Sequence, residues 1–157
     1  MSVEAKLMEL GIQLPPPPPA VAAYEPWMRT GNLILTSGQL PWKNGELAFS
    51  GKCGAGITED QGYQAARQCA INAISQLKAA AGDLDRVRQI VKVDGYVHTA
   101  PGFRGHPQVL NGASELIRSV FGERGRHARL AVGIDEMPLN AAVQICVTAE
   151  IEDYPIS

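Results

Sequence analysis

The chain has 157 residues, of which 45% are hydrophobic and 19% charged, so it fits one domain of ordinary size with a sizeable core. Its net charge of -2 and its pI near 5.9 argue against a broad phosphate-binding surface, so no nucleic-acid partner is expected. The three cysteines are scattered without a CxxC pair, which indicates reduced thiols in a cytoplasmic protein. The histidines lack metal-ligand spacing and no apolar run approaches the ~20 residues of a membrane span, so we expect neither a metal nor a membrane.

The N-terminal segment is predicted to be a short helix followed by a rigid extended stretch. Residues 3–10 have an amphipathic pattern, and Gly11 can end the helix. Five consecutive prolines at 15–19 impose a polyproline II backbone without N–H donors. Such a run can be a ligand for an SH3-like partner or a strap that ties the helix to the domain. The strap is favoured because no basic residue flanks the run.

Two short strands, at 27–29 and 33–36, are predicted on either side of a Thr-Gly-Asn turn. Gly38 lies where the second strand closes, and a glycine there lets the backbone approach another group. It can be the floor of a binding loop or part of a plain bulge, and composition does not separate the two. An Asn-Gly pair within residues 42–50 predicts another turn with a short strand.

Two long amphipathic helices are predicted in the middle of the chain. The first follows a capping-box pattern that begins at Thr58, and it runs to about residue 81, where Gly82 stops it. After a Gly/Pro loop at 100–106, the second helix starts at Pro107 and runs to about residue 121. Each helix has one apolar stripe, which suits packing against a sheet.

Strand-like alternation at 89–99, 128–134 and 143–151 completes the order β-β-β-α-β-α-β-β. In the first of these strands Val91, Val93, Gly95 and Val97 are predicted to share one face. The order predicts an α+β fold in one domain over residues 1–157, a single mixed sheet with both helices on one face. The other face is predicted to carry Arg129, Gln144, Cys146 and Thr148. A face without its own helices invites a second copy, so a homo-oligomer is expected.

Arg129 is the unusual residue of these strands because small and apolar residues flank it. One interpretation is an edge arginine whose charge reaches water past the sheet, since charged residues are mostly exposed. The other is an anion clamp, because a guanidinium offers a planar fork of donors that fits a carboxylate. The residues alone leave both interpretations open.

Taken together, these segments resemble the reactive-intermediate deaminase family, RidA/YjgF-like and formerly labelled the L-PSP endoribonuclease family. The matching stretches are L-I-L-T-S-G-Q-L-P at 33–41, the helix from Thr58 with Asn72, residues 83–97, and H-A-R-L-A-V-G with M-P-L and V-Q-I at 127–145. The resemblance covers a core at about 21–152. The N-terminal helix and proline strap at 1–20 have no counterpart in the short members, so the chain resembles a longer, divergent branch.

The resemblance implies a chorismate-mutase-like fold in which three subunits close their sheets into a central barrel. The pockets of such a homotrimer lie at the subunit interfaces. Members with the arginine hydrolyse reactive enamines and imines, such as 2-aminoacrylate and 2-iminopropanoate, to 2-oxo acids and ammonia, and they need no cofactor. Arg129 matches the carboxylate-binding arginine of the family. Four further residues match positions that line its pocket: Tyr24, Ser37, Gly38 and Asn111.

Two positions depart from the family pattern. Gln144 stands where well-studied members often carry a glutamate that positions the attacking water, and Ala131 stands where they often carry a cysteine. Arg129 and Gln144 are therefore the expected catalytic positions. Gln144 can hydrogen-bond a water molecule but cannot accept its proton near neutral pH, and general acid–base catalysis is typically worth ~10²–10⁴-fold in rate.

Three functions follow from this pattern. The preferred one is a 2-iminobutanoate/2-iminopropanoate deaminase-like hydrolase acting on small enamine and imine substrates. The main alternative is a non-catalytic trimer that binds small carboxylates or metabolites, which Gln144 and Ala131 favour. The old label suggests an endoribonuclease, but the sequence has no basic stripe with interleaved aromatic residues and no histidine pair at useful spacing.

Overall fold

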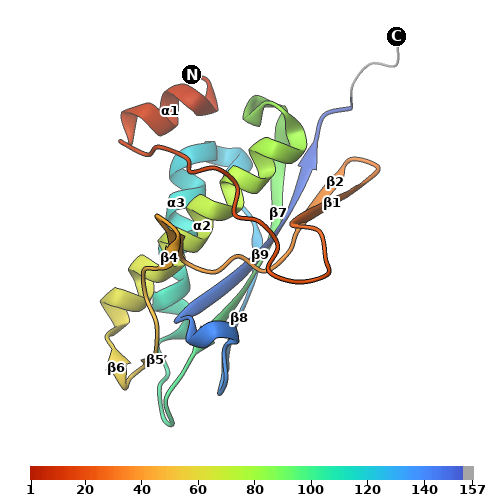
Figure 1. Ribbon diagram of the computed structural model, residues 1–157. Helices are drawn as coiled ribbons and strands as arrows, with labels where there is room; N and C mark the ends of the chain where they lie inside the picture. The colour runs from red at the N-terminus through yellow and green to blue at the C-terminus, as the bar shows by residue number, and fades with distance from the viewer. Residues whose placement is uncertain (154–157) are drawn as a thin grey trace.

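The fold is built on one five-stranded mixed sheet, and the computed structural model describes residues 1–153 of the chain (Figure 1). In spatial order the strands are β1 (Trp27–Thr30), β2 (Leu33–Thr36), β9 (Val143–Ile151), β7 (Val87–His98) and β8 (Ala128–Ile134). Neighbours are antiparallel except β7 and β8, which are parallel. Helices α2 (Glu59–Ala81) and α3 (His106–Phe121) lie over one face. The predicted α+β class with two long helices on one face of a mixed sheet is confirmed. Residues 154–157 of the predicted domain lie outside the described part.

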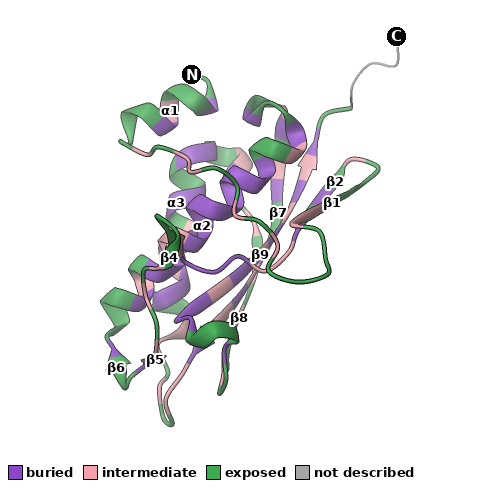
Figure 2. Cartoon of the chain, viewed as in Figure 1, coloured by how far each residue is buried: buried purple, intermediate pink, exposed green. Residues whose placement is uncertain are grey.

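Helix α2 begins where the capping box predicts. The backbone N–H of Gln61 donates to Thr58 Oγ1 at 3.1 Å, and the backbone N–H of Thr58 donates to Gln61 Oε1 at 2.9 Å. Gly82 ends the helix with a φ of 80°, which favours glycine. Small residues on its buried side, such as Ala65 and Ala66, bring it close to its neighbours, and Figure 2 shows the burial along this layer.

Helix α3 packs against α2 at a glycine. A Cβ atom at Gly112 would lie 2.0 Å from the carbonyl oxygen of Tyr63 on α2, so only a glycine allows this approach of the two backbones. A Cβ at Gly95 of β7 would lie 2.2 Å from Leu110 Cδ1 of α3. These two contacts fix the distance of α3 from both α2 and the sheet, and they identify the face of β7 that the helix covers.

The predicted face of one β7 residue is wrong. Val91 was predicted to share a face with Val93, but its side chain is 39% exposed, whereas Ile90 and Val93 are buried. The register of β7 against β9 shifts between Ile90 and Lys92, as at a β-bulge. One extra residue in a strand reverses the alternation beyond it, so the pattern over 89–99 joined two segments of opposite phase.

The predicted face of Arg129 is also wrong. Arg129 pairs with Val93 of β7, which pairs in turn with Val147 of β9, and paired residues point to the same face. Val93 and Val147 are buried under the helices. Gln144 pairs with Tyr96, which lies an odd number of residues from Val93 along β7. The side chains of Tyr96 and Gln144 therefore point to the opposite face. Cys146 and Thr148 lie on that opposite face as predicted. Alternation divides a strand into two sets of residues but does not decide which set the helices cover.

The remaining elements are short. β3 (Trp42–Lys43) and β4 (Glu46–Leu47) pair as a hairpin around the predicted turn, where one short strand was expected, and Asn44 and Gly45 are both at positive φ in that turn. β5 (Lys52–Cys53) and β6 (Gly56–Ile57) form a small ladder that the sequence analysis did not predict. Three single 3₁₀ turns connect larger elements: η1 (Leu84–Arg86), η2 (Gly122–Gly125) and η3 (Pro138–Asn140).

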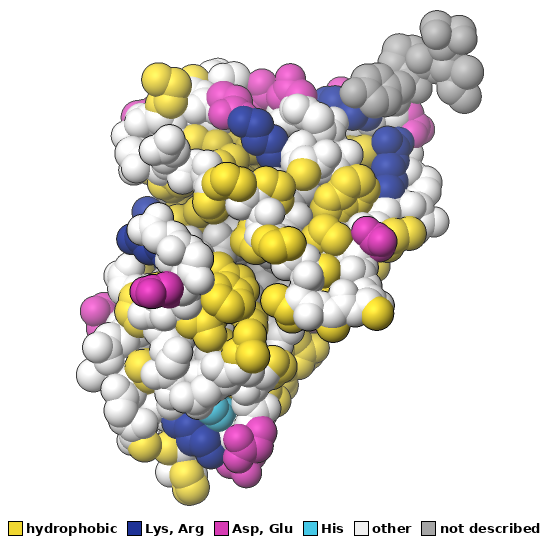
Figure 3. All heavy atoms as spheres, viewed as in Figure 1, with side chains coloured by type: hydrophobic (Ala, Val, Ile, Leu, Met, Phe, Trp, Pro, Cys, Tyr) yellow, Lys and Arg dark blue, Asp and Glu magenta, His cyan; other side chains and the backbone are white. Residues whose placement is uncertain are grey.

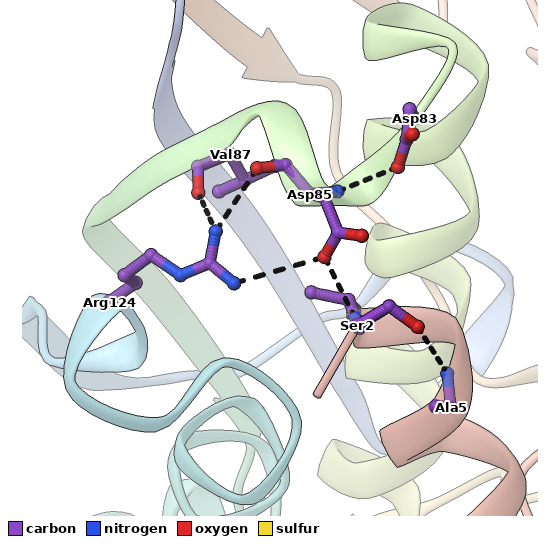
Figure 4. Close-up of polar contacts among 7 residues, drawn as sticks. Ser2, Ala5, Asp83, Asp85, Val87 and Arg124 are labelled. Atoms are coloured by element: carbon purple, nitrogen blue, oxygen red, sulfur yellow. Dashed lines mark hydrogen bonds and ion pairs between the residues drawn. The ribbon is translucent and has the colours of Figure 1, made fainter.

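Helix α1 (Val3–Glu9) is anchored at its first residues (Figure 4). The backbone N–H of Val3 donates to Asp85 Oδ1 at 2.8 Å, and the side chain of Ser2 caps the helix by accepting from the N–H of Ala5 at 3.0 Å. Arg124 Nη1 donates to the carbonyl oxygens of Asp85 and Val87 at 3.1 and 2.8 Å. The start of the chain is thereby tied to the segment that leads into β7.

The proline run lies along α2. Ser75 Oγ donates to the carbonyl oxygen of Pro15 at 2.5 Å, and Gln76 Nε2 donates to that of Pro18 at 2.7 Å. Prolines have no N–H to offer, so only their carbonyl groups can be tied down in this way. The run therefore acts as the strap that joins α1 to the core. In residues 1–153, no helix is both long enough and apolar enough to cross a membrane.

Candidate functional site

The residues predicted for the site fall into two groups in a single chain. One, here called the loop group, consists of Tyr24, Ser37, Gly38 and Gln144. The other, here called the arginine group, consists of Arg129 and Asn111. Because Arg129 and Gln144 point to opposite faces of the sheet, one copy of the chain does not bring the two expected catalytic residues to the same surface.

The loop group is held between the N-terminal segment and β9. The Ser37 hydroxyl donates to the carbonyl oxygen of Glu25 at 2.5 Å, and the Ser37 N–H donates to that of Pro26 at 2.9 Å. The backbones of Gln39 and Ile145 exchange two hydrogen bonds, of 2.7 and 3.1 Å. The loop after β2 is therefore hydrogen-bonded to β9 at the residue that follows Gln144.

Gly38 lies directly under the side chain of Gln144. A Cβ atom at position 38 would be 1.8 Å from Gln144 Nε2 and 2.7 Å from its Cδ. The close approach of the backbone to another group accounts for this glycine, and it is compatible with both a binding-loop floor and a plain bulge. Tyr24, Ser37 and Gly38 also line a small cavity of about 30 Å³, which the strap closes on one side with Pro18 and its neighbours. That is roughly the volume of one water molecule.

A larger open cavity adjoins this one. Its volume is about 450 Å³, and its lining is mainly apolar: Pro15, Pro16, Pro18, Pro19, Val21 and Trp42, with Lys43, Asn44, Gly45 and Asn72. Hydrophobic side chains gather on the face that carries the strap and the β3–β4 hairpin (Figure 3). Trp42 and part of the strap line both cavities, so the strap forms one wall of the space beside the loop group.

Arg129 is held against α3 by hydrogen bonds. Its Nη1 donates to Asn111 Oδ1 at 2.9 Å and to Ser114 Oγ at 3.2 Å, and its Nη2 donates to the carbonyl oxygen of Pro107 at 3.4 Å. These three bonds use three of the five N–H donors of a guanidinium. The Nε–H and one hydrogen of Nη2 have no partner within residues 1–153. Asn111, which the resemblance placed in the pocket, thus contacts Arg129, and an edge of the guanidinium is left that fits a carboxylate.

Two residues beside Arg129 were missed by the sequence analysis. His127 Nε2 lies 2.9 Å from Ser114 Oγ, and His127 Nδ1 lies 2.7 Å from the carbonyl oxygen of Gly125. The spacing of the histidines predicts neither a metal site nor a catalytic pair, and within residues 1–153 no group of three or more side chains that could hold a metal is present. The available signals were spacings: Ser114 follows Asn111 by one helical turn, and His127 precedes Arg129 by two strand residues.

The surroundings of the thiols near the sheet favour the protonated form over the nucleophilic thiolate. Burial raises the pKa of the Cys146 thiol, and the negative charge of Asp94 raises it further. Burial together with Glu59 raises the pKa of Cys53 to about 11. A thiol must lose its proton to attack an electrophile. The groups gathered around Arg129 and Gln144 therefore offer the chemistry of a guanidinium, amides, hydroxyls and one imidazole.

Comparison with known proteins gave concordant matches. A family model described as "YjgF/chorismate mutase-like, putative endoribonuclease" matches residues 4–151. Protein TCP17 of Trypanosoma cruzi is 43% identical over 152 residues, which are 96% of this chain and 95% of that protein.

Solved structures of similar proteins have the same fold. Protein Atu1372 of Agrobacterium tumefaciens is 43% identical with a TM-score of 0.89, over 96% of this chain and 92% of that one. A protein of Shewanella oneidensis MR-1 is 38% identical with a TM-score of 0.94, over 96% and 100% of the two chains. RidA from the Antarctic bacterium Psychrobacter sp. PAMC 21119 is 25% identical with a TM-score of 0.62, over 87% and 94%.

Proposed function

The chain belongs to the YjgF/chorismate mutase-like family, and from this premise we propose that it is a hydrolytic deaminase of small 2-imino acids and their enamine tautomers. The observation that carries the proposal is the environment of Arg129. Its guanidinium is held by Asn111, Ser114 and Pro107, lies against no carboxylate of the described residues, and keeps its Nε–Nη2 edge for a ligand. A substrate carboxylate on that edge gains charge-assisted hydrogen bonds worth about 1.5–3 kcal/mol each.

The active assembly is a homotrimer in which each pocket takes the arginine group from one copy and the loop group from its neighbour. Two features support this arrangement. The two groups point away from each other within one chain. The face of the sheet opposite the helices also exposes apolar side chains: Met28 at 61%, Leu33 at 38%, Leu35 at 42% and Leu130 at 39%. Exposed apolar side chains on adjacent strands, as where Met28 of β1 pairs with Leu35 of β2, are typical of contacts between proteins.

The reaction needs little from the protein beyond positioning. The imine carbon is already electrophilic, so the pocket must hold the carboxylate and place one water molecule against that carbon. The water oxygen forms a bond to carbon, and the C=N π electrons move to nitrogen, which gives a carbinolamine. The nitrogen then gains a proton, the hydroxyl group loses one, and the C–N bond breaks as the C=O bond forms, which releases ammonia and leaves the 2-oxo acid. The Gln144 amide holds the water, and the proton passes to solvent or to the substrate nitrogen because an amide does not accept it.

A second candidate is a trimer that binds small carboxylates without turnover. The observation that favours it is the amide of Gln144 at the position where a carboxylate base is expected. This function predicts saturable, Arg129-dependent binding of 2-oxobutanoate without faster release of ammonia from imines.

A coupled assay tests the proposed deaminase. A pyridoxal-phosphate dehydratase acting on serine supplies 2-aminoacrylate, and formation of pyruvate is followed with and without this protein. The wild type is expected to accelerate the hydrolysis, and Arg129→Ala is expected to return it to the uncatalysed rate. Arg126→Ala is the matched control, because the Arg126 side chain is exposed and forms an ion pair with Glu123 at 3.2 Å. Full activity in Arg129→Ala would refute the role of the guanidinium.

A further inference from the structure

The guanidinium of Arg129 is the end of a chain of hydrogen bonds that runs from a backbone carbonyl. The chain passes from the Gly125 carbonyl oxygen through the ring of His127 and the hydroxyl of Ser114 to Arg129 Nη1, with successive distances of 2.7, 2.9 and 3.2 Å. The family comparison assigns no role to Ser114 or His127. Both side chains are half-buried, so they are neither free in solvent nor part of the hydrophobic core.

For a neutral His127 ring, the partners set the direction of each bond in this chain. A carbonyl oxygen only accepts, so Nδ1 of His127 carries the hydrogen that it shares with Gly125. In the neutral ring Nε2 is then an acceptor, and the Ser114 hydroxyl must donate to it. This donation leaves the lone pairs of Ser114 Oγ for the N–H of Arg129. Without the imidazole, the hydroxyl hydrogen is free to rotate toward Arg129 or toward Asn111 Oδ1. The hydrogen bond from Arg129 Nη1 to Ser114 Oγ is then weakened.

The first member of the chain is fixed in place by packing. A Cβ atom at Gly125 would lie 2.6 Å from the carbonyl oxygen of Ile117 and 3.0 Å from Arg118 Cα, so the backbone of Gly125 is pressed against the last turns of α3. The same helix carries Ser114 and Asn111. Both ends of the hydrogen-bond chain therefore contact α3. That helix, and not only the flexible side chain of Arg129, sets the position of the guanidinium.

From this geometry we propose that Ser114 and His127 are positioning residues for carboxylate capture, because they hold Nη1 of Arg129 and turn its Nε–Nη2 edge toward the ligand. The inference deepens the proposed function and rests on it for the identity of the ligand. A bidentate pair requires the guanidinium in one orientation, so an arginine fixed before binding loses less conformational freedom when the carboxylate arrives. Removing one charge-assisted anchor is expected to weaken binding by roughly tenfold.

The test uses 2-oxobutanoate, a stable 2-oxo acid, as the probe in isothermal titration calorimetry with the full chain. Ser114→Ala and His127→Phe are expected to raise Kd about tenfold. His127→Gln keeps an amide oxygen that can accept from Ser114, so it is expected to recover most of that loss. Ser119→Ala, on the same helix but exposed, is the matched control and should bind as the wild type does. The double variant of Ser114 and His127 should bind no worse than either single variant, because both changes break one chain.

The kinetics separate positioning from a merely structural role. In the coupled assay both single variants should raise KM while kcat changes little, and thermal unfolding should show that they remain folded at the assay temperature. Folded Ser114→Ala with wild-type Kd would overturn the proposal, as would a wild type that does not bind 2-oxobutanoate. Binding that follows the expected pattern without turnover of 2-iminopropanoate would contradict the deaminase and support the positioning role.

Discussion

Replacing Gly38 by alanine perturbs the loop group at one defined contact. The added methyl carbon would lie 1.8 Å from Gln144 Nε2, whereas ordinary van der Waals contacts begin at 3.4 Å, so the amide must retreat by about 1.6 Å. The φ of Gly38 lies outside the left-handed region, so alanine is tolerated by the backbone itself. The change therefore acts on the position of Gln144 and not on the loop's conformation.

The expected magnitudes follow from that displacement. The obstructing atoms are the far end of a flexible side chain, and moving such a side chain off its preferred rotamer costs about 0.5–1.5 kcal/mol. For a chain of this length a loss of about 1 kcal/mol lowers Tm by roughly 2–4 °C. A group displaced by more than 1 Å from its working position can cost about 10²-fold in rate. We therefore expect a small loss of stability with a large loss of activity.

The assay compares kcat/KM in the coupled reaction and Tm for Gly38→Ala, Gln144→Ala and the double variant. The double variant removes the clash, so both its Tm and its activity should return to those of Gln144→Ala. Wild-type kcat/KM in Gly38→Ala, together with a strong loss of kcat/KM in Gln144→Ala, would refute the reasoning. It would show that catalysis does not require the Gln144 amide in its position against Gly38.

Two further predictions concern stability. Gly112→Ala places a methyl carbon 2.0 Å from the backbone oxygen of Tyr63, which cannot rotate away, so α2 and α3 must separate. The free energy of unfolding should therefore fall by about 1–3 kcal/mol. An unchanged midpoint in urea denaturation would contradict this. The pKa of Cys53 is raised to about 11 in the folded protein from an ordinary value of 9.0, so its contribution to stability is present below pH 9 and is lost as pH rises through 11. Urea denaturation at pH 8 and 10.5 should show this decrease, and Cys53→Ala should reduce it; an identical decrease in the variant would assign it to other groups.

Local signals in the sequence determined the elements and their ends. The capping box at Thr58 and Gln61 fixes the start of α2, because both partners lie within one helical turn of each other. The Asn44-Gly45 pair fixes the β3–β4 turn, because few other residues adopt positive φ there. The same sequence selected Arg129 as the candidate anion clamp, since a guanidinium among small strand residues is unusual on chemical grounds alone.

Only the tertiary structure decided which residues meet. The bulge near Val91 reverses the phase of β7. The register of β8 against β7 sends Arg129 to the helix side of the sheet, and the register of β9 against β7 sends Gln144 to the other side. The contact of His127 with Ser114 likewise joins a residue before a strand to one on a helix, 13 positions apart. Alternation and spacing are properties of neighbours along the chain, whereas face and partner depend on pairing between distant segments. A shift of one residue in that pairing exchanges the two faces of a strand without altering the hydrophobic pattern of either segment.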